Sequence, residues 1–188
     1  VASLGTVDHV TLTTGQTVSL TQAQYLDPAV QTALGKITNL STVGIAVTGA
    51  TVANASTLAN AAVVKSIQVV DSASNLSNAS LDSLNLIASK IASVAIANGQ
   101  SITLTAAQMT SDAAILAKFA AGVSYNVTNV LAANAGSVVA NTKVASVSIV
   151  DSAANVATSL DALQNVAASG KLNAIALSVT CHEPDPRG

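Results

Sequence analysis

This sequence has little charge and very few aromatic side chains. Charged residues make up 9% of its 188 residues and aromatic residues 2%, whereas a typical soluble domain is about 25% charged. Tryptophan is absent and the formal net charge is −2. Nucleic-acid binding needs a basic patch, and single strands also need stacking aromatic side chains. We therefore expect no nucleic-acid partner.

Long apolar runs are also missing, although half of the chain is hydrophobic. Ser, Asn, Thr and Lys interrupt every apolar stretch before it reaches about 18 residues, the length that predicts a transmembrane helix. We therefore expect no membrane insertion. The small Ala and Val side chains favour a thin core in which layers pack closely, rather than a large core built around aromatic anchors.

The single cysteine excludes an internal disulfide framework, and it lies in a tail of foreign composition. Residues 181–188, CHEPDPRG, hold the only Cys, Glu and Arg of the chain. We predict one repeat domain over residues 1–180, followed by a flexible tail, linker or expression remnant. The acidic and metal-ligating side chains of the tail are adjacent in a proline-broken segment, whereas zinc ligands usually come in separated pairs. Cys181 remains available for an intermolecular disulfide.

What the sequence does contain is a repeat. VVDSASNLSNASLDSL, from Val69, returns as IVDSAANVATSLDAL, from Ile149. In the same way GQTVSLTQAQ, from Gly15, returns as GQSITLTAAQ, from Gly99. These spacings predict a super-repeat of about 80 residues. The start at Val1, without Met or a leader, indicates a processed product or a piece of a longer chain.

Six lysines mark a shorter period of about 27 residues, in the range of β/α solenoids. Each lysine precedes a β-rich run, and most runs follow a stretch with helical spacing. We predict an α/β fold, a right-handed β/α solenoid with a parallel sheet, in which each helix ends near a lysine that complements its dipole. Both faces of the strands are expected to be apolar, and a further strand is expected at residues 9–15. The lysines are Lys36, Lys65, Lys90, Lys118, Lys143 and Lys171.

Two long phrases carry a resemblance. They are VASVSIVDSAANVATSLDALQNVAASGKLNAIALS, from Val144, and ITLTAAQMTSDAAILAKFAAGVSYNVTNV, from Ile102. Both resemble tandem repeats of very large secreted bacterial surface proteins, the adhesin or haemagglutinin-like proteins that type I systems often export. The resemblance covers residues 7–179 and implies an extracellular or cell-surface, structural or adhesive role without catalytic residues. The chain lacks the glycine-rich nonapeptide calcium repeats of many such proteins, so calcium dependence does not carry over.

The candidate site residues have structural interpretations beside functional ones. Asp71 and Asp151 follow strands and precede helices, where a carboxylate caps a helix by accepting from free N–H groups. The alternative is a repeated calcium or ligand contact, although calcium prefers several oxygen ligands. Thr21 and Thr105 are each followed by Gln three residues later, which matches the capping box.

Enzyme chemistry has few residues to use. His9 is the only histidine before the tail, and a Ser-His-Asp arrangement would have to recruit it with Asp8 or Asp27. The sequence shows no paired carboxylates and no phosphate-binding loop. We therefore predict no enzyme, no catalytic, cofactor-binding or metal-binding residues and no cofactor, with calcium as the one ion considered.

Three functions remain open. The first is a structural or adhesive module that acts by stacking and surface contact, with a second copy end to end, a surface glycan or a host surface as partner. The second is a solenoid binding protein that presents one face to a glycan or another ligand, although exposed aromatics are nearly absent. The third is an enzyme on a β-solenoid, such as a polysaccharide lyase, against which the missing carboxylate clusters count.

Overall fold

The computed structural model describes residues 7–98 and 101–178 of the chain. It divides the chain into two compact units, residues 1–99 with 112–121 and residues 100–111 with 122–188. Each unit contains a parallel four-stranded sheet and helices. The predicted α/β fold with parallel sheets is therefore confirmed, and the single domain over residues 1–180 stays a prediction.

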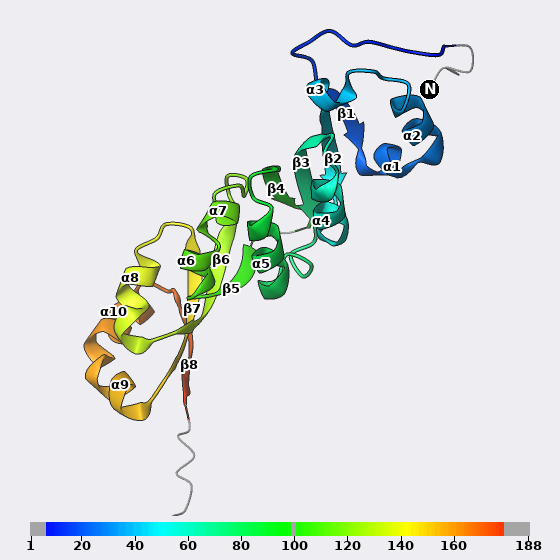
Figure 1. Ribbon diagram of the computed structural model, residues 1–188. Helices are drawn as coiled ribbons and strands as arrows, with labels where there is room; N and C mark the ends of the chain where they lie inside the picture. Colours follow the sequence, from blue (N-terminus) through cyan, green and yellow to red (C-terminus); the bar gives the residue numbers. More distant parts are fainter. Residues whose placement is uncertain (1–6, 99–100, 179–188) are drawn as a thin grey trace, which may run out of the picture. The chain divides into compact units, whose positions relative to one another are not determined.

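The first unit has its strands in the order β1-β2-β3-β4, all parallel (Figure 1). Helices connect successive strands, as parallel pairing requires, and one bridge from Val94 to Phe119 extends the sheet beyond β4. The strands are β1 (Val18–Thr21), β2 (Ile45–Ala50), β3 (Val64–Asp71) and β4 (Ile91–Ile96). The helices are α1 (Gln22–Leu26), α2 (Pro28–Leu34), α3 (Leu40–Val43), α4 (Val52–Asn60), α5 (Asn78–Leu86) and α7 (Ala113–Leu116).

The second unit has the parallel order β5-β6-β7-β8. Its elements repeat the strand and helix alternation of the first unit. The strands are β5 (Ser101–Thr105), β6 (Ser124–Val130), β7 (Val144–Asp151) and β8 (Leu172–Leu177). The helices are α6 (Gln108–Ser111), the 3-10 turn η1 (Ala132–Asn134), α8 (Ala135–Val139), α9 (Ala153–Thr158) and α10 (Leu160–Ala168).

The two sheets share one register, so the repeated phrases fold alike. The β2–β3 ladder opens with Ile45 opposite Val64, and the β6–β7 ladder opens with Tyr125 opposite Val144. Both ladders shift register immediately after that pair and again three residues before the strand ends. Each sheet is therefore one copy of the super-repeat, and each copy contributes four strands.

The sequence prediction placed six of these strands and missed two. The lysine-based period predicted β2, β3, β4, β6, β7 and β8, but not the short strands β1 and β5. At residues 9–15, where a strand was expected, the backbone makes a single bridge from Val10 to Ile37. The strands of one sheet begin at Val18, Ile45, Val64 and Ile91, so their spacing is uneven. A uniform period hides this because short polar strands such as VSLT carry little apolar signal.

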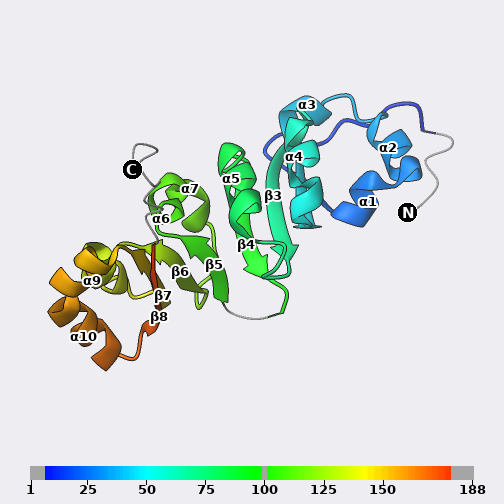
Figure 2. The ribbon, with the colours of Figure 1, turned by 90° about the horizontal axis from the view of Figure 1, so that it is seen from below.

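The prediction of two apolar strand faces is wrong. Along β3 the side chains of Val64, Ile67 and Val69 are buried, whereas those of Lys65 and Gln68 are exposed. In the first unit α4 packs against β3, and α5 lies beside α4 (Figure 2). The opposite face is open and carries polar residues, so the period of two that marks a half-buried strand applies here.

Lys65 lies close to the end of its own helix and donates to Ala62 O, just after α4, at 3.1 Å, whereas Lys90 and Lys171 bind the ends of earlier helices. None of the described helices has a basic residue in its last turn. Instead, Lys90 Nζ donates to the carbonyl oxygens of Ala59 (2.5 Å) and Ala61 (3.1 Å), at the end of α4. Lys171 Nζ donates to Val139 O, at the end of α8, over 3.1 Å. Lys90 and Lys171 therefore each bind free carbonyls at the end of the helix one strand–helix repeat earlier.

Candidate functional site

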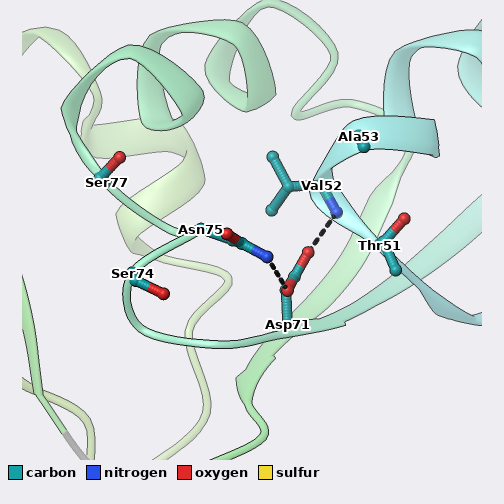
Figure 3. A pocket seen from close by; sticks show the side chains of 7 residues that line it. All are labelled: Thr51, Val52, Ala53, Asp71, Ser74, Asn75 and Ser77. Atoms are coloured by element: carbon teal, nitrogen blue, oxygen red, sulfur yellow. Dashed lines mark hydrogen bonds between the residues drawn. The ribbon is translucent and has the colours of Figure 1, made fainter.

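The candidate site is a depression of about 480 Å³ in the first unit, at the carboxyl ends of β2 and β3 (Figure 3). One side is the start of α4, and the other is the loop that leads from β3 to α5. Open α/β sheets place their ligands outside the carboxyl ends of the strands. The lining residues are Thr51, Val52, Ala53, Asp71, Ser74, Asn75 and Ser77.

Asp71 joins the two sides of the depression. Its carboxylate Oδ1 accepts hydrogen bonds from the Ser72 backbone N–H and from Asn75 Nδ2, both at 2.8 Å. Oδ2 accepts from the backbone N–H of Val52 at 2.9 Å (Figure 3). Val52 is the first residue of α4, and the preceding Thr51 makes no side-chain cap bond. Asp71 therefore caps a helix. This helix is α4, which precedes β3 in the chain, and not α5, which follows it.

The environment of Asp71 keeps the carboxylate charged. Burial opposes the charged form and by itself would raise the pKa. The hydrogen bonds from Asn75, Val52 and Ser72 favour the charged form more strongly, and the pKa of Asp71 lies below its usual value. Its three hydrogen bonds hold the charged carboxylate between the start of α4 and the loop after β3, which fits a structural role.

Asp151 in the second unit repeats these contacts. Its Oδ1 accepts from the Ser152 backbone N–H at 2.8 Å and from Asn155 Nδ2 at 2.7 Å, and its Oδ2 accepts from the Ala132 backbone N–H at 2.9 Å. The bonds from Asn155, Ala132 and Ser152 lower the pKa of Asp151, against a weaker opposing effect of burial. Ala132 opens the 3-10 turn η1. In both copies, therefore, the same cap joins two neighbouring strand–helix repeats.

The two copies differ in the side chains around the carboxylate. With Asp71 aligned on Asp151, the first unit places three hydroxyl-bearing residues where the second has apolar ones. Ser74 and Ser77 are exposed, and Thr51 is half-buried. Hydroxyl groups that line a depression can donate to and accept from a neutral polar ligand. The aligned pairs are Thr51 with Leu131, Ser74 with Ala154, and Ser77 with Ala157.

Sequence reasoning singled out Asp71 but not the three hydroxyl-bearing residues near it. The signal was present, because the repeated phrases differ at Ser74 and Ser77 while Asp71 and Asn75 recur. Residues that recur serve the scaffold, whereas residues that differ are free to serve a site in one copy. Thr51 lies outside the matched phrase, and only the pairing of β2 with β3 inside the first unit brings it to the depression.

Metal and membrane chemistry find little support in the described part of the chain. Within residues 7–98 and 101–178, no three His, Cys, Asp or Glu side chains gather in a way that could hold an ion. The lining of the depression offers one carboxylate, which is already hydrogen-bonded. Among the helices of the same residues, none has the length and the apolar character to cross a bilayer.

Thr21, Thr105 and Asp27, which the sequence also singled out, make structural contacts. At α1, Thr21 Oγ1 accepts from the Gln24 N–H at 3.2 Å, and Gln24 Oε1 accepts from the Thr21 N–H at 2.9 Å, so the predicted capping box is confirmed. Thr105 and Gln108 make the same pair of bonds, at 3.2 and 3.0 Å. Asp27, considered as a partner for a catalytic histidine, accepts from Ala29 N–H and caps α2.

Two predicted features lie outside the described residues. They are Gly99, which begins a repeated phrase, and the tail with Cys181. No protein-family model, no curated protein and no solved structure matches this chain. The internal repeat and the depression at Asp71 are therefore the two features from which a function is proposed.

Proposed function

We propose that this chain is a structural and adhesive module of a secreted or cell-surface bacterial repeat protein, which acts by stacking and by surface contact. The observation that carries the proposal is the recurrence of contacts between neighbouring strand–helix units. The aspartate cap of the preceding helix occurs at Asp71 and Asp151, and the lysine contact with an earlier helix end occurs at Lys90 and Lys171. Catalysis needs a single site, whereas a stacked scaffold needs the contacts between neighbouring repeats in every copy.

The architecture that fits this role is a right-handed solenoid of about 27-residue strand–helix units. Two findings support it. Consecutive strands are neighbours and parallel within each sheet, and once in each copy the cap and the lysine contact link one strand–helix unit to the unit before it. In such an array the stability is a sum of nearest-neighbour contacts, so copies can be added without a new core.

The proposal includes an extracellular or surface location, no catalytic residues and no required cofactor. We expect a calcium chelator to leave the thermal unfolding midpoint unchanged, because Asp71 and Asp151 each already accept three hydrogen bonds from the protein. Differential scanning calorimetry of the intact chain with chelator and with excess calcium measures this. A midpoint that rises with calcium would show that the ion is part of the fold.

A surface-retention assay tests the function itself. Fluorescently labelled chain is applied to immobilised polysaccharides, host-cell surfaces and bare hydrophobic and hydrophilic supports. An adhesive module is expected to be retained on at least one of these surfaces, and retention should survive changes at the hydroxyl-lined depression. A chain that is retained on none of them would not be an adhesive module.

The depression at Asp71 favours a second candidate, a binding protein for a glycan. Its hydroxyl-bearing lining is present in one copy alone, which a purely structural role does not require. The second unit supplies the matched change: a triple variant with Thr51→Leu, Ser74→Ala and Ser77→Ala gives the first unit the lining of the second. The control is Ser56→Ala, an exposed change on α4 outside this lining. Loss of glycan retention in the triple variant alone would favour the binding protein.

A further inference from the structure

At the end of the second sheet, β8 and the start of α10 leave apolar side chains uncovered. Leu160, Ile175 and Leu177 are 57%, 41% and 57% exposed. The phrase and strand alignments pair these residues with more deeply buried positions of the first unit. The counterparts are Leu81 and Val94, which are fully buried, and Ile96, which is half-buried. One sequence pattern therefore forms core in the first unit and surface in the second.

In the first unit, residues 112–121 provide the missing cover. The Val94 N–H donates to Lys118 O at 2.8 Å, and the Ala120 N–H donates to Val94 O at 3.0 Å, with Phe119 as the bridge partner. Just before this bridge, α7 packs against α5. We call this arrangement of a helical turn and a bridge the covering segment. It completes the buried face around β4, where Phe119 is itself buried.

The outer edge of β8 is prepared for the same bridge. Ile149 pairs with Ile175 as Val69 pairs with Val94, after the same register shift. In this register the backbone N–H and C=O of Ile175 point away from β7, as those of Val94 point away from β3. Among the described residues, none forms a bridge on that side of β8. The two ladders end on equivalent bonds, from Ala97 N–H to Asp71 O and from Ser178 N–H to Asp151 O, both 2.8 Å.

The chain also contains a second covering segment, near its start. There the Val10 N–H donates to Lys36 O and the Thr38 N–H donates to Val10 O, both at 2.9 Å, with Ile37 as the bridge partner. This repeats the geometry at Val94. The sequence LGKIT after α2 occupies the place that LAKFA has after α7. Residues 7–12, which receive this bridge, form no regular strand and are exposed or half-buried. Side-chain hydrogen bonds with Thr38 and Asn39 also hold them, and any exchange of this bridge would have to replace these bonds as well.

We propose that β8 of one copy pairs with residues 36–38 of a second copy, in place of that copy's own Val10. Ile175 would accept from the Thr38 N–H and donate to Lys36 O, so the exchange keeps both backbone hydrogen bonds. It also buries the apolar side chains that β8 and α10 now expose, which supplies the driving force. The contact joins two different surfaces and is not self-complementary, so it adds copies end to end. This inference rests on the proposed stacking role and names its partner, a second copy of this chain.

Two variants block opposite sides of the proposed contact. Ile175→Lys places a charge on the exposed edge of β8, a device that prevents edge pairing. Thr38→Pro removes the N–H that Ile175 would accept from on the other copy. Val10→Pro removes the donor of the competing internal bridge and is expected to strengthen association. Leu86→Lys is the matched control, because Leu86 is 88% exposed and belongs to α5, which is part of neither proposed surface.

Light-scattering mass after size exclusion gives the readout, under reducing conditions so that Cys181 forms no disulfide. The mass of the unchanged chain and of Leu86→Lys should grow with concentration between about 1 µM and about 1 mM. Ile175→Lys and Thr38→Pro should each remain monomeric when alone. Their equimolar mixture should give a species of twice the monomer mass that grows no further, because each variant keeps one competent surface.

Several results would overturn the proposal. The first is that Ile175→Lys assembles like the unchanged chain. The second is that the mixture of the two blocked variants stays monomeric while the unchanged chain assembles. The third is that Val10→Pro is monomeric at all concentrations. Circular dichroism spectra show whether each variant is folded, and for a Thr38→Pro that is not, Ile37→Lys replaces it. Surface retention by a strictly monomeric chain would reject this contact and leave the adhesive role standing. Assembly without retention on any surface would do the reverse.

Discussion

Asp71 and Asp151 make the same hydrogen bonds, but the side chains around them differ. Both carboxylates accept three hydrogen bonds from equivalent donors, with lengths that agree to 0.1 Å. Around the first lie Thr51, Ser74 and Ser77, and around the second lie apolar side chains. The comparison shows which part of the repeat the fold requires. The aspartate cap between neighbouring strand–helix repeats is kept in both copies. The side chains that line the depression beside it differ between the copies.

A second difference lies at the ends of the two sheets. β4 is covered by the segment that contains Phe119, whereas β8 has no such cover among the described residues. The same apolar pattern is therefore buried in one copy and exposed in the other. Whether an apolar side chain of a repeat is buried depends on the segment that packs against it, and not on the sequence of that repeat alone.

The largest expected effect sharpens this second difference. Leu81→Ala should lower the free energy of unfolding by about 3 kcal/mol, since it opens a cavity at a fully buried position. Leu160→Ala, at the aligned but exposed position, should change it by no more than about 0.5 kcal/mol. Urea denaturation of both variants measures the two values. Equal losses would mean that α10 is covered in solution, as it would be in an end-to-end assembly, and dilution should then separate them.

The next effect concerns the aspartate cap. Asp71→Ala should destabilise the first unit by about 2 kcal/mol, because it leaves the Val52 N–H and the Asn75 side chain without their charged acceptor. Native-state hydrogen exchange should show faster exchange at the Val52 amide. Asp151→Ala should have the same effect at Ala132 and leave Val52 unchanged. Coupled loss of both amides would indicate that the two units unfold together.

The pH dependence follows from the same carboxylates. The pKa values of Asp71 and Asp151 are lower in the folded chain than their usual value, which is about 3.9 in unfolded chains. The unfolded state therefore binds protons first, so stability is full above about pH 4 and falls as the pH drops below it. Thermal midpoints between pH 7 and pH 2.5 test this. The double variant Asp71→Asn with Asp151→Asn should show a flatter acid limb; an unchanged limb would assign it to other carboxylates.

The smallest effect compares the two lysine contacts. Lys90 Nζ donates to two carbonyl oxygens of the α4 end, and Lys171 Nζ to one of the α8 end. Lys90→Met keeps the alkyl stem and should cost about 1 kcal/mol, and Lys171→Met should cost less. Chemical denaturation of the two variants orders them. The reverse order would mean that the lysines act mainly through their stems.

Several features followed from the sequence alone. Six of the eight strands, their parallel pairing, the long repeat and the capping box at Thr21 were predicted, and the structure shows all of them. These features depend on residues that are close in the chain or on connections long enough for a crossover helix. The short strands β1 and β5 escaped prediction because four or five mostly polar residues carry too little apolar signal.

The partners of the charged residues were decided by tertiary structure. Asp71 was expected to cap the helix that follows it, yet it binds Val52, 19 positions earlier. Lys90 was expected at the end of its own helix, yet it binds the end of α4, 29 and 31 positions earlier. A local pattern shows that a side chain can cap, but stacking of the strands decides which helix end lies within hydrogen-bond distance.

The sequence by itself thus determined the class of fold, the repeat and the residues able to make caps. Tertiary structure alone decided which strand face is buried, which unit each cap joins, and that the hydroxyl-bearing residues Thr51, Ser74 and Ser77 share one depression. The physical reason is range. Helix and strand signals act over a few residues, whereas each contact between stacked units joins segments about one unit apart, and only sheet register sets which atoms meet.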